Sequence, residues 1–96
     1  MKVTALTHLI PAADFAREIN HVVTVLEAGG YSTAGMDFTD LIARRLGDAF
    51  ARSLTEKGAW IKNHNWEMKA DRSLRIKIYL PREEDVPLVQ GIITST

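Results

Sequence analysis

Few residues in this 96-residue chain have the types and spacing that catalysis or metal binding requires. Its three histidines, His8, His21 and His64, fall on three different expected elements, and no pair has the spacing of metal ligands on one helix. The chain has no cysteine, which excludes disulfides, thiol nucleophiles and every cysteine-ligated zinc site. We therefore expect neither a metal nor another cofactor.

The carboxylates and hydroxyls do not form a catalytic pattern either. General acid–base chemistry needs two carboxylates that converge on a cleft, one of them with a raised pKa. Here Asp14, Glu18 and Glu27 fall on the polar side of the first expected helix, and the acidic run 83–85 is typical of a solvated turn. No serine occurs in a nucleophile-elbow sequence. The sequence therefore favours binding over enzymatic activity.

The clearest departure from neutrality lies in the segment 59–81. It has five lysines or arginines against two acidic residues, a local charge of +3, although the whole chain has twelve of each and a net charge of zero. We expect a partner-binding face made by Lys69, Arg72, Arg75, Lys77 and Tyr79. Such a face is also compatible with an ordinary solvent-exposed hairpin, with an acidic protein surface, or with a nucleic-acid backbone.

Two amphipathic helices must support this face. Residues 2–9 alternate as a strand does, and Pro11 suits the first turn of a helix. Apolar residues then recur at helical spacing, which predicts a helix over 12–28 that ends at Gly29. Asp37 is a suitable cap for a second helix that Gly58 closes. The apolar side of this second helix is expected to comprise Phe38, Leu41, Ile42, Leu46, Ala49, Phe50 and Leu54.

Beyond Gly58 the period changes from 3.6 residues to two. Residues 66–70 and 74–80 alternate as a hairpin, and a three-residue loop, 71–73, keeps the apolar side chains of both strands on one face. This register places Lys69 opposite Arg75, a like-charge pair, and Glu67 opposite Lys77. After a charged turn we expect a third strand of the sheet over 86–94.

These elements predict a single α+β domain over residues 1–96, with two amphipathic helices packed on one face of a small antiparallel sheet in the order β-α-α-β-β-β. The first strand is expected at an edge or beside the central strand. No segment approaches the length of a membrane span or forms a convincing targeting signal, so we expect a cytoplasmic protein without a membrane partner.

The element order resembles that of the RelE/ParE toxin superfamily, small ribosome-associated ribonucleases or gyrase poisons. The resemblance covers topology alone. It implies action on RNA or its machinery, with Lys69, Arg75 and Lys77 in the position of the sheet cations of the ribonuclease members. The C-terminal residues 92–96 supply no basic or aromatic group of the kind those members use.

Three functions therefore remain open at this point. The first is a non-catalytic interaction module, a regulator, inhibitor or accessory subunit, that binds a larger protein or ribonucleoprotein partner through the basic hairpin. The second is a nucleic-acid-binding or toxin-like protein. The third is a structural subunit of a homo-oligomer in which the C-terminal strand pairs between copies.

Overall fold

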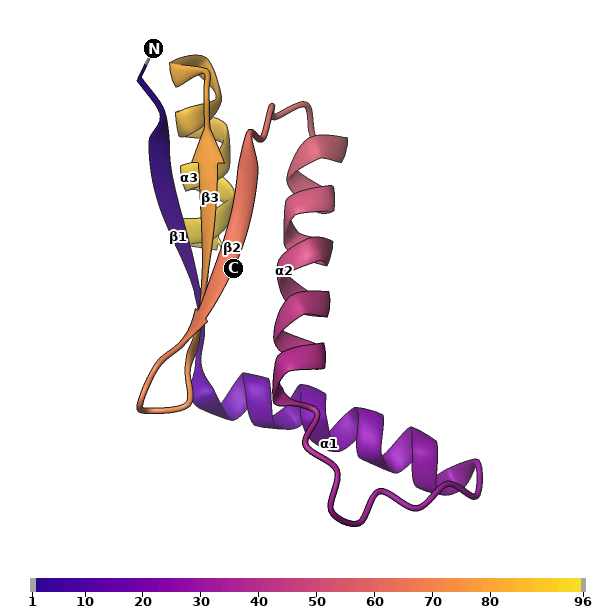
Figure 1. Ribbon diagram of the computed structural model, residues 1–96. Coiled ribbons are helices and arrows are strands. Elements are labelled where there is room, and N and C mark those ends of the chain that lie inside the picture. Colours follow the sequence, from indigo (N-terminus) through magenta and orange to yellow (C-terminus); the bar gives the residue numbers. More distant parts are fainter. Residues whose placement is uncertain (1, 96) are drawn as a thin grey trace.

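The computed structural model describes residues 2–95 and confirms the α+β class. In this part of the chain, three α-helices accompany a three-stranded antiparallel sheet (Figure 1). The elements in chain order are β1 (Thr4–Ile10), α1 (Ala12–Ala28), α2 (Thr39–Glu56), β2 (Asn63–Met68), β3 (Leu74–Leu80), a 3-10 turn η1 (Glu83–Asp85) and α3 (Val86–Ser95). None of the helices within residues 2–95 combines the length and apolar character needed to cross a bilayer.

Strand β3 is the centre of the sheet, with the strand order β1-β3-β2. Its even-numbered side chains, Leu74, Ile76, Ile78 and Leu80, are at most 1% exposed and form the middle of the core. Strand β1 pairs antiparallel with β3, so it is an edge strand that lies beside the central strand, and both expected placements hold together. The alternating pattern of apolar residues thus correctly predicts which side of β3 is buried.

The C-terminal segment is a helix, so the expected strand over 86–94 is wrong. Val86, Val89 and Ile93 lie three and four residues apart and therefore on one side of α3, where Val89 is fully buried. Pro87 stands in the first turn, the position in which a helix tolerates proline. The true order is β-α-α-β-β-α. Because 86–95 form a helix, no C-terminal strand is present there to pair between copies. The resemblance to the RelE/ParE toxins depended on the expected element order, so it no longer has support.

The two helices that cover the sheet are α2 and α3, whereas the sequence predicted α1 and α2. Helix α2 packs on β2 and α3 packs on β1, both against the side that carries Ile76 and Ile78 (Figure 1). Helix α1 turns away after Pro11 and projects from the end of the sheet as an arm (Figure 1). Within the described chain, Phe15 is the one residue of α1 that is fully buried.

The hairpin between β2 and β3 has a register two residues away from the expected one. Trp66 lies opposite Ile76 and Met68 lies opposite Leu74. The loop still has three residues, but they are 70–72, because Asp71 accepts hydrogen bonds from the backbone N–H and the hydroxyl of Ser73 at 2.9 and 2.6 Å and closes the turn one residue early. The shift of two preserves the side of the sheet on which each residue lies.

A charged cluster joins the start of α3 to the segment between α2 and β2. The buried carboxylate of Asp85 accepts hydrogen bonds from Nε and Nη2 of Arg82, both at 2.9 Å, and from the backbone N–H of Trp60 at 3.0 Å. The Arg82 guanidinium also lies 4.3 Å from the centre of the Trp60 ring. These bonds to the charged form hold the pKa of Asp85 below its ordinary value.

Candidate binding surface

The side of the sheet opposite α2 and α3 is an open surface made by the odd-numbered residues of the strands. The central strand contributes Arg75, which is exposed, and Lys77 and Tyr79, which are half-buried. The flanking positions are small, polar or apolar side chains that are all exposed: Ala5, Thr7 and Leu9 on β1, and Asn63, Asn65 and Glu67 on β2. We call these nine residues the open face.

Arg75, Lys77 and Tyr79 form a stripe along the middle of the open face. Lys77 lies between Thr7 and Asn65, and the amide of Asn65 donates to the Tyr79 hydroxyl at 3.4 Å. In the described part of the chain, neither Arg75 nor Lys77 has a hydrogen bond or salt bridge to its side chain. Two cations and a phenol are therefore available to a partner.

The expected like-charge pair of Lys69 and Arg75 does not exist. The observed register places Glu67, not Lys69, opposite Arg75, so opposite charges face each other across the strands. Lys69 lies at the margin of the open face, where its ammonium is 3.3 Å from the Glu67 carboxylate. This salt bridge is solvent-exposed and of small energetic value, about 0.2–1 kcal/mol. Lys69 is thus partly neutralised.

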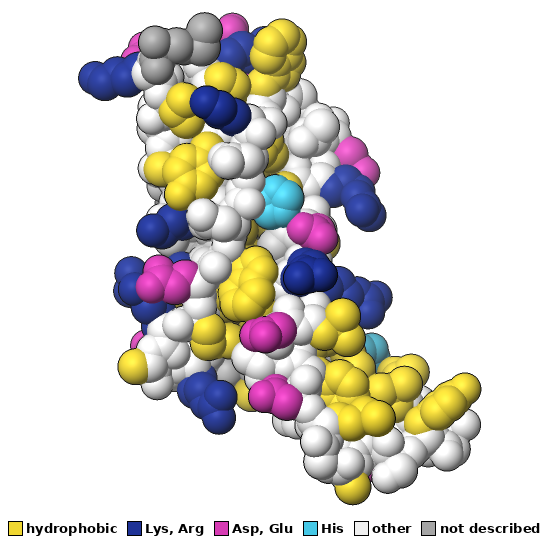
Figure 2. All heavy atoms as spheres, viewed as in Figure 1, with side chains coloured by type: hydrophobic (Ala, Val, Ile, Leu, Met, Phe, Trp, Pro, Cys, Tyr) yellow, Lys and Arg dark blue, Asp and Glu magenta, His cyan; other side chains and the backbone are white. Residues whose placement is uncertain are grey.

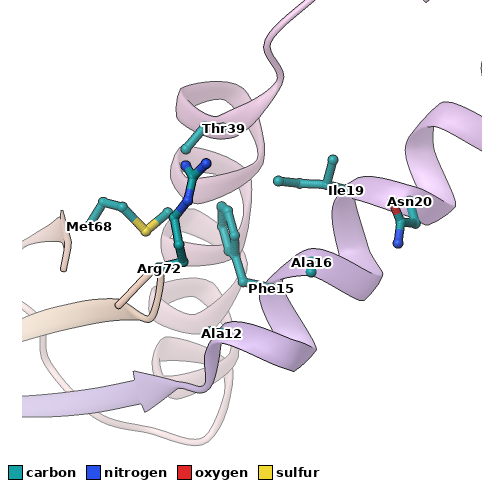
Figure 3. Close-up of a pocket in the computed structure, with 8 residues that line it drawn as sticks. All are labelled: Ala12, Phe15, Ala16, Ile19, Asn20, Thr39, Met68 and Arg72. Atoms are coloured by element: carbon teal, nitrogen blue, oxygen red, sulfur yellow. The ribbon is translucent and has the colours of Figure 1, made fainter. Parts of the chain in front are cut away.

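Arg72 does not belong to the open face. It has a positive φ of 72°, the left-handed conformation that follows a type I turn in a three-residue hairpin loop. Figure 3 shows its side chain directed toward Phe15 of α1 and Thr39 at the start of α2. These residues line a hollow of about 240 Å³, and the charge of Arg72 helps the bonds from Thr39 to lower the pKa of Asp37. Arg72 therefore lies against the junction of the hairpin with the helices.

The structure brings together one pair that sequence reasoning placed apart. Nε2 of His64, on β2, lies 2.8 Å from a carboxylate oxygen of Asp48, on α2. The sequence pattern places Asp48 among the solvated charges on the outer side of its helix, and His64 in a polar loop or at the start of a strand; the structure has His64 as the second residue of β2. Their proximity depends on how α2 crosses β2, and no local sequence pattern predicts it. Gly47, beside Asp48, is buried at this contact, and a Cβ there would meet the His64 ring at 3.9 Å, an ordinary van der Waals distance.

Elsewhere in residues 2–95 there is no group of three or more histidine and carboxylate side chains arranged to hold a metal ion. Comparisons of the chain with known protein families, with curated proteins and with solved structures find no match. The arrangement of the open face is consequently the basis for a functional assignment.

Proposed function

We propose that this protein is a non-catalytic interaction module, and that the open face binds an extended, acidic segment of a larger protein. The observation that carries this proposal is the stripe of Arg75, Lys77 and Tyr79, whose two cations make no side-chain hydrogen bond or salt bridge within the described chain. A regulatory, inhibitory or accessory role and a cytoplasmic location stay predictions within this proposal.

The spacing of the stripe favours an extended acidic partner. Arg75 and Lys77 are two residues apart on one strand, so their Cα atoms are about 6.6–6.8 Å apart. Acidic side chains at alternate positions of an extended peptide have the same spacing, because the period of both chains is two residues. Tyr79 continues the stripe by two residues and adds an aromatic surface with a hydroxyl, the combination that is common at protein interfaces.

A protein partner is favoured over a nucleic acid by the charge and composition of this surface. Sheets that bind RNA stack successive bases on two or three aromatic rings, whereas the open face presents Tyr79 as its aromatic residue. Affinity for a phosphate backbone grows with the number of neutralised phosphates, and the stripe on the described face has two cations, one of which, Arg75, lies opposite Glu67. The net charge of the chain is zero.

The test is affinity capture from an extract of the native host, with mass spectrometry of the recovered proteins and with and without nuclease treatment. The variant Arg75→Glu/Lys77→Glu reverses the stripe. The matched control Lys2→Glu/Lys57→Glu makes the same charge change at two exposed lysines, one before β1 and one directly after α2, that lie outside the open face. Loss of two exposed ion pairs together with the new repulsion is expected to weaken binding on the order of tenfold.

The expected result is a protein that the wild type and the control recover, that the reversed stripe does not recover, and that nuclease leaves bound. Recovery of the same material by all three proteins would mean that the stripe is not the contact. Recovery that depends on nucleic acid would replace the acidic protein with a nucleic-acid ligand on this face.

A further inference from the structure

A second surface, which shares no residue with the open face, lies in the angle between the projecting arm α1 and the helix α2 (Figure 1). We call it the inner corner and define it by Val22, Val25 and Leu26 of α1 and by Leu41, Arg45 and Ala49 of α2. Val25 is 56% exposed and Leu41 is 58% exposed. Figure 2 shows apolar side chains gathered over the lower right of the molecule, where Figure 1 places α1.

Leu41 and Ala49 explain why this surface was not expected. Both were predicted to face the core, but the buried residues of α2 are Ile42, Ala43, Gly47, Ala51 and Leu54. Leu41, Arg45 and Ala49 are four residues apart, so they lie on one side of α2, and all three are exposed. Helix α2 therefore has one apolar side in the core and part of a second in the inner corner.

We propose that a second copy of this chain covers the inner corner, so that the protein forms a homodimer in which the arms lie against each other's α2 helices. The first argument is area. The chain exposes 6472 Å², roughly 1,000 Å² more than the ~5,500 Å² typical of a compact monomer of this mass. A stable interface of standard size removes about 800 Å² from each partner.

The shape of the molecule also indicates more exposed surface than a compact monomer has. Its radius of gyration is 15.3 Å, against about 12.5 Å for a compact domain of this length. Its longest dimension is 49 Å and the other two are 28 and 23 Å. Helix α1 projects from the sheet and lengthens the molecule (Figure 1), and most of its residues are exposed. If two copies pack about a two-fold axis, with the α1 of each copy in the angle between α1 and α2 of the other, both arms are covered at once.

Charge favours this occupant as well. Residues 18–28 of the arm carry Glu18 and Glu27 and no lysine or arginine. Residues 44–52 of α2 carry three arginines against one aspartate, and that aspartate, Asp48, is bonded to His64. In a two-fold interface the same patch is present on both sides, so the acidic arm of one copy meets the basic side of α2 of the other.

The experiment measures the mass in solution by light scattering after size-exclusion chromatography, at several concentrations of the full chain. We expect twice the 10.7 kDa of one chain. Val25→Glu and, independently, Leu41→Glu place a charge in the inner corner at exposed positions, and each should weaken association at least about tenfold. Thr24→Glu, exposed on the opposite side of α1, is the matched control and should leave the dimer intact.

Circular dichroism checks that each variant keeps its helix content. A wild-type chain that stays monomeric at all concentrations would overturn the proposal. So would a dimer that folded Val25→Glu and Leu41→Glu proteins form as readily as Thr24→Glu does, because the contact would then lie elsewhere. The dimer does not involve the open face, so reversal of Arg75 and Lys77 should leave the mass unchanged.

Discussion

Replacement of Gly47 by alanine should stabilise the protein, although this glycine lies where α2 packs against β2. Glycine inside a helix costs roughly 0.5–1 kcal/mol relative to alanine. The added Cβ would meet the rings of His64 and Trp66 at 3.9 Å each, which is ordinary van der Waals contact. Burial of one methyl group contributes up to about 0.8 kcal/mol. The sum is an increase of about 0.5–1.8 kcal/mol in the free energy of unfolding.

Valine at the same position should have the opposite effect. Its γ-methyl groups reach about 1.5 Å beyond Cβ, into the space that the rings of His64 and Trp66 occupy. Overpacking of this kind costs about 1–3 kcal/mol. The change of sign between Gly47→Ala and Gly47→Val therefore measures how much room the packing of α2 on β2 leaves.

Gly91→Ala in α3 is the matched control. Gly91 is exposed, and a Cβ there would have nothing within 4 Å, so this variant reports helix propensity without new packing. Urea unfolding followed by circular dichroism gives the free energies. A change of 1 kcal/mol also shifts the Tm by about 4–8 °C in a domain of this size. Destabilisation by Gly47→Ala together with stabilisation by Gly91→Ala would refute the reasoning, because helix propensity would then be outweighed by a clash.

Two further predictions concern acid. The ring of His8 stacks on that of Phe50, with 4.3 Å between the ring centres, and burial lowers the pKa of His8. The unfolded chain therefore binds the proton more readily than the folded chain does. The free energy of unfolding should be greatest above about pH 6.5 and fall as the pH drops below it. His8→Phe should remove this part of the pH dependence, and parallel urea-midpoint curves for the two proteins between pH 5 and 7.5 would contradict it. The pKa of Asp85 is lowered by the bonds from Arg82 and from the backbone N–H of Trp60, so its contribution should be present above about pH 4 and be lost as the pH falls through the lower pKa of the folded state. Asp85→Asn should lower the urea midpoint at pH 7 and flatten the curve below pH 4; an unchanged midpoint at pH 7 would show that the cluster adds no stability.

Local periodicity in the sequence determined much of the fold. The helix over 12–28 agrees with α1, and the alternation in 74–80 correctly identifies the buried side of β3. Both depend on where side chains point relative to their own backbone, a property that repeats every 3.6 or two residues whatever the rest of the chain does. The same pattern placed Arg75, Lys77 and Tyr79 together on one side of a strand.

Only the tertiary structure decided how these elements meet. Short apolar runs such as 86–94 suit a strand or a helix equally, and contact with β1 determines that Val89 is buried in a helix. The register of the hairpin followed from the bonds between Asp71 and Ser73. The pairing of His64 with Asp48, and the projection of α1, which leaves the inner corner uncovered, arise from the relative placement of distant segments. Side-chain periodicity carries no information about that placement, because each element could bury its apolar side against more than one neighbour.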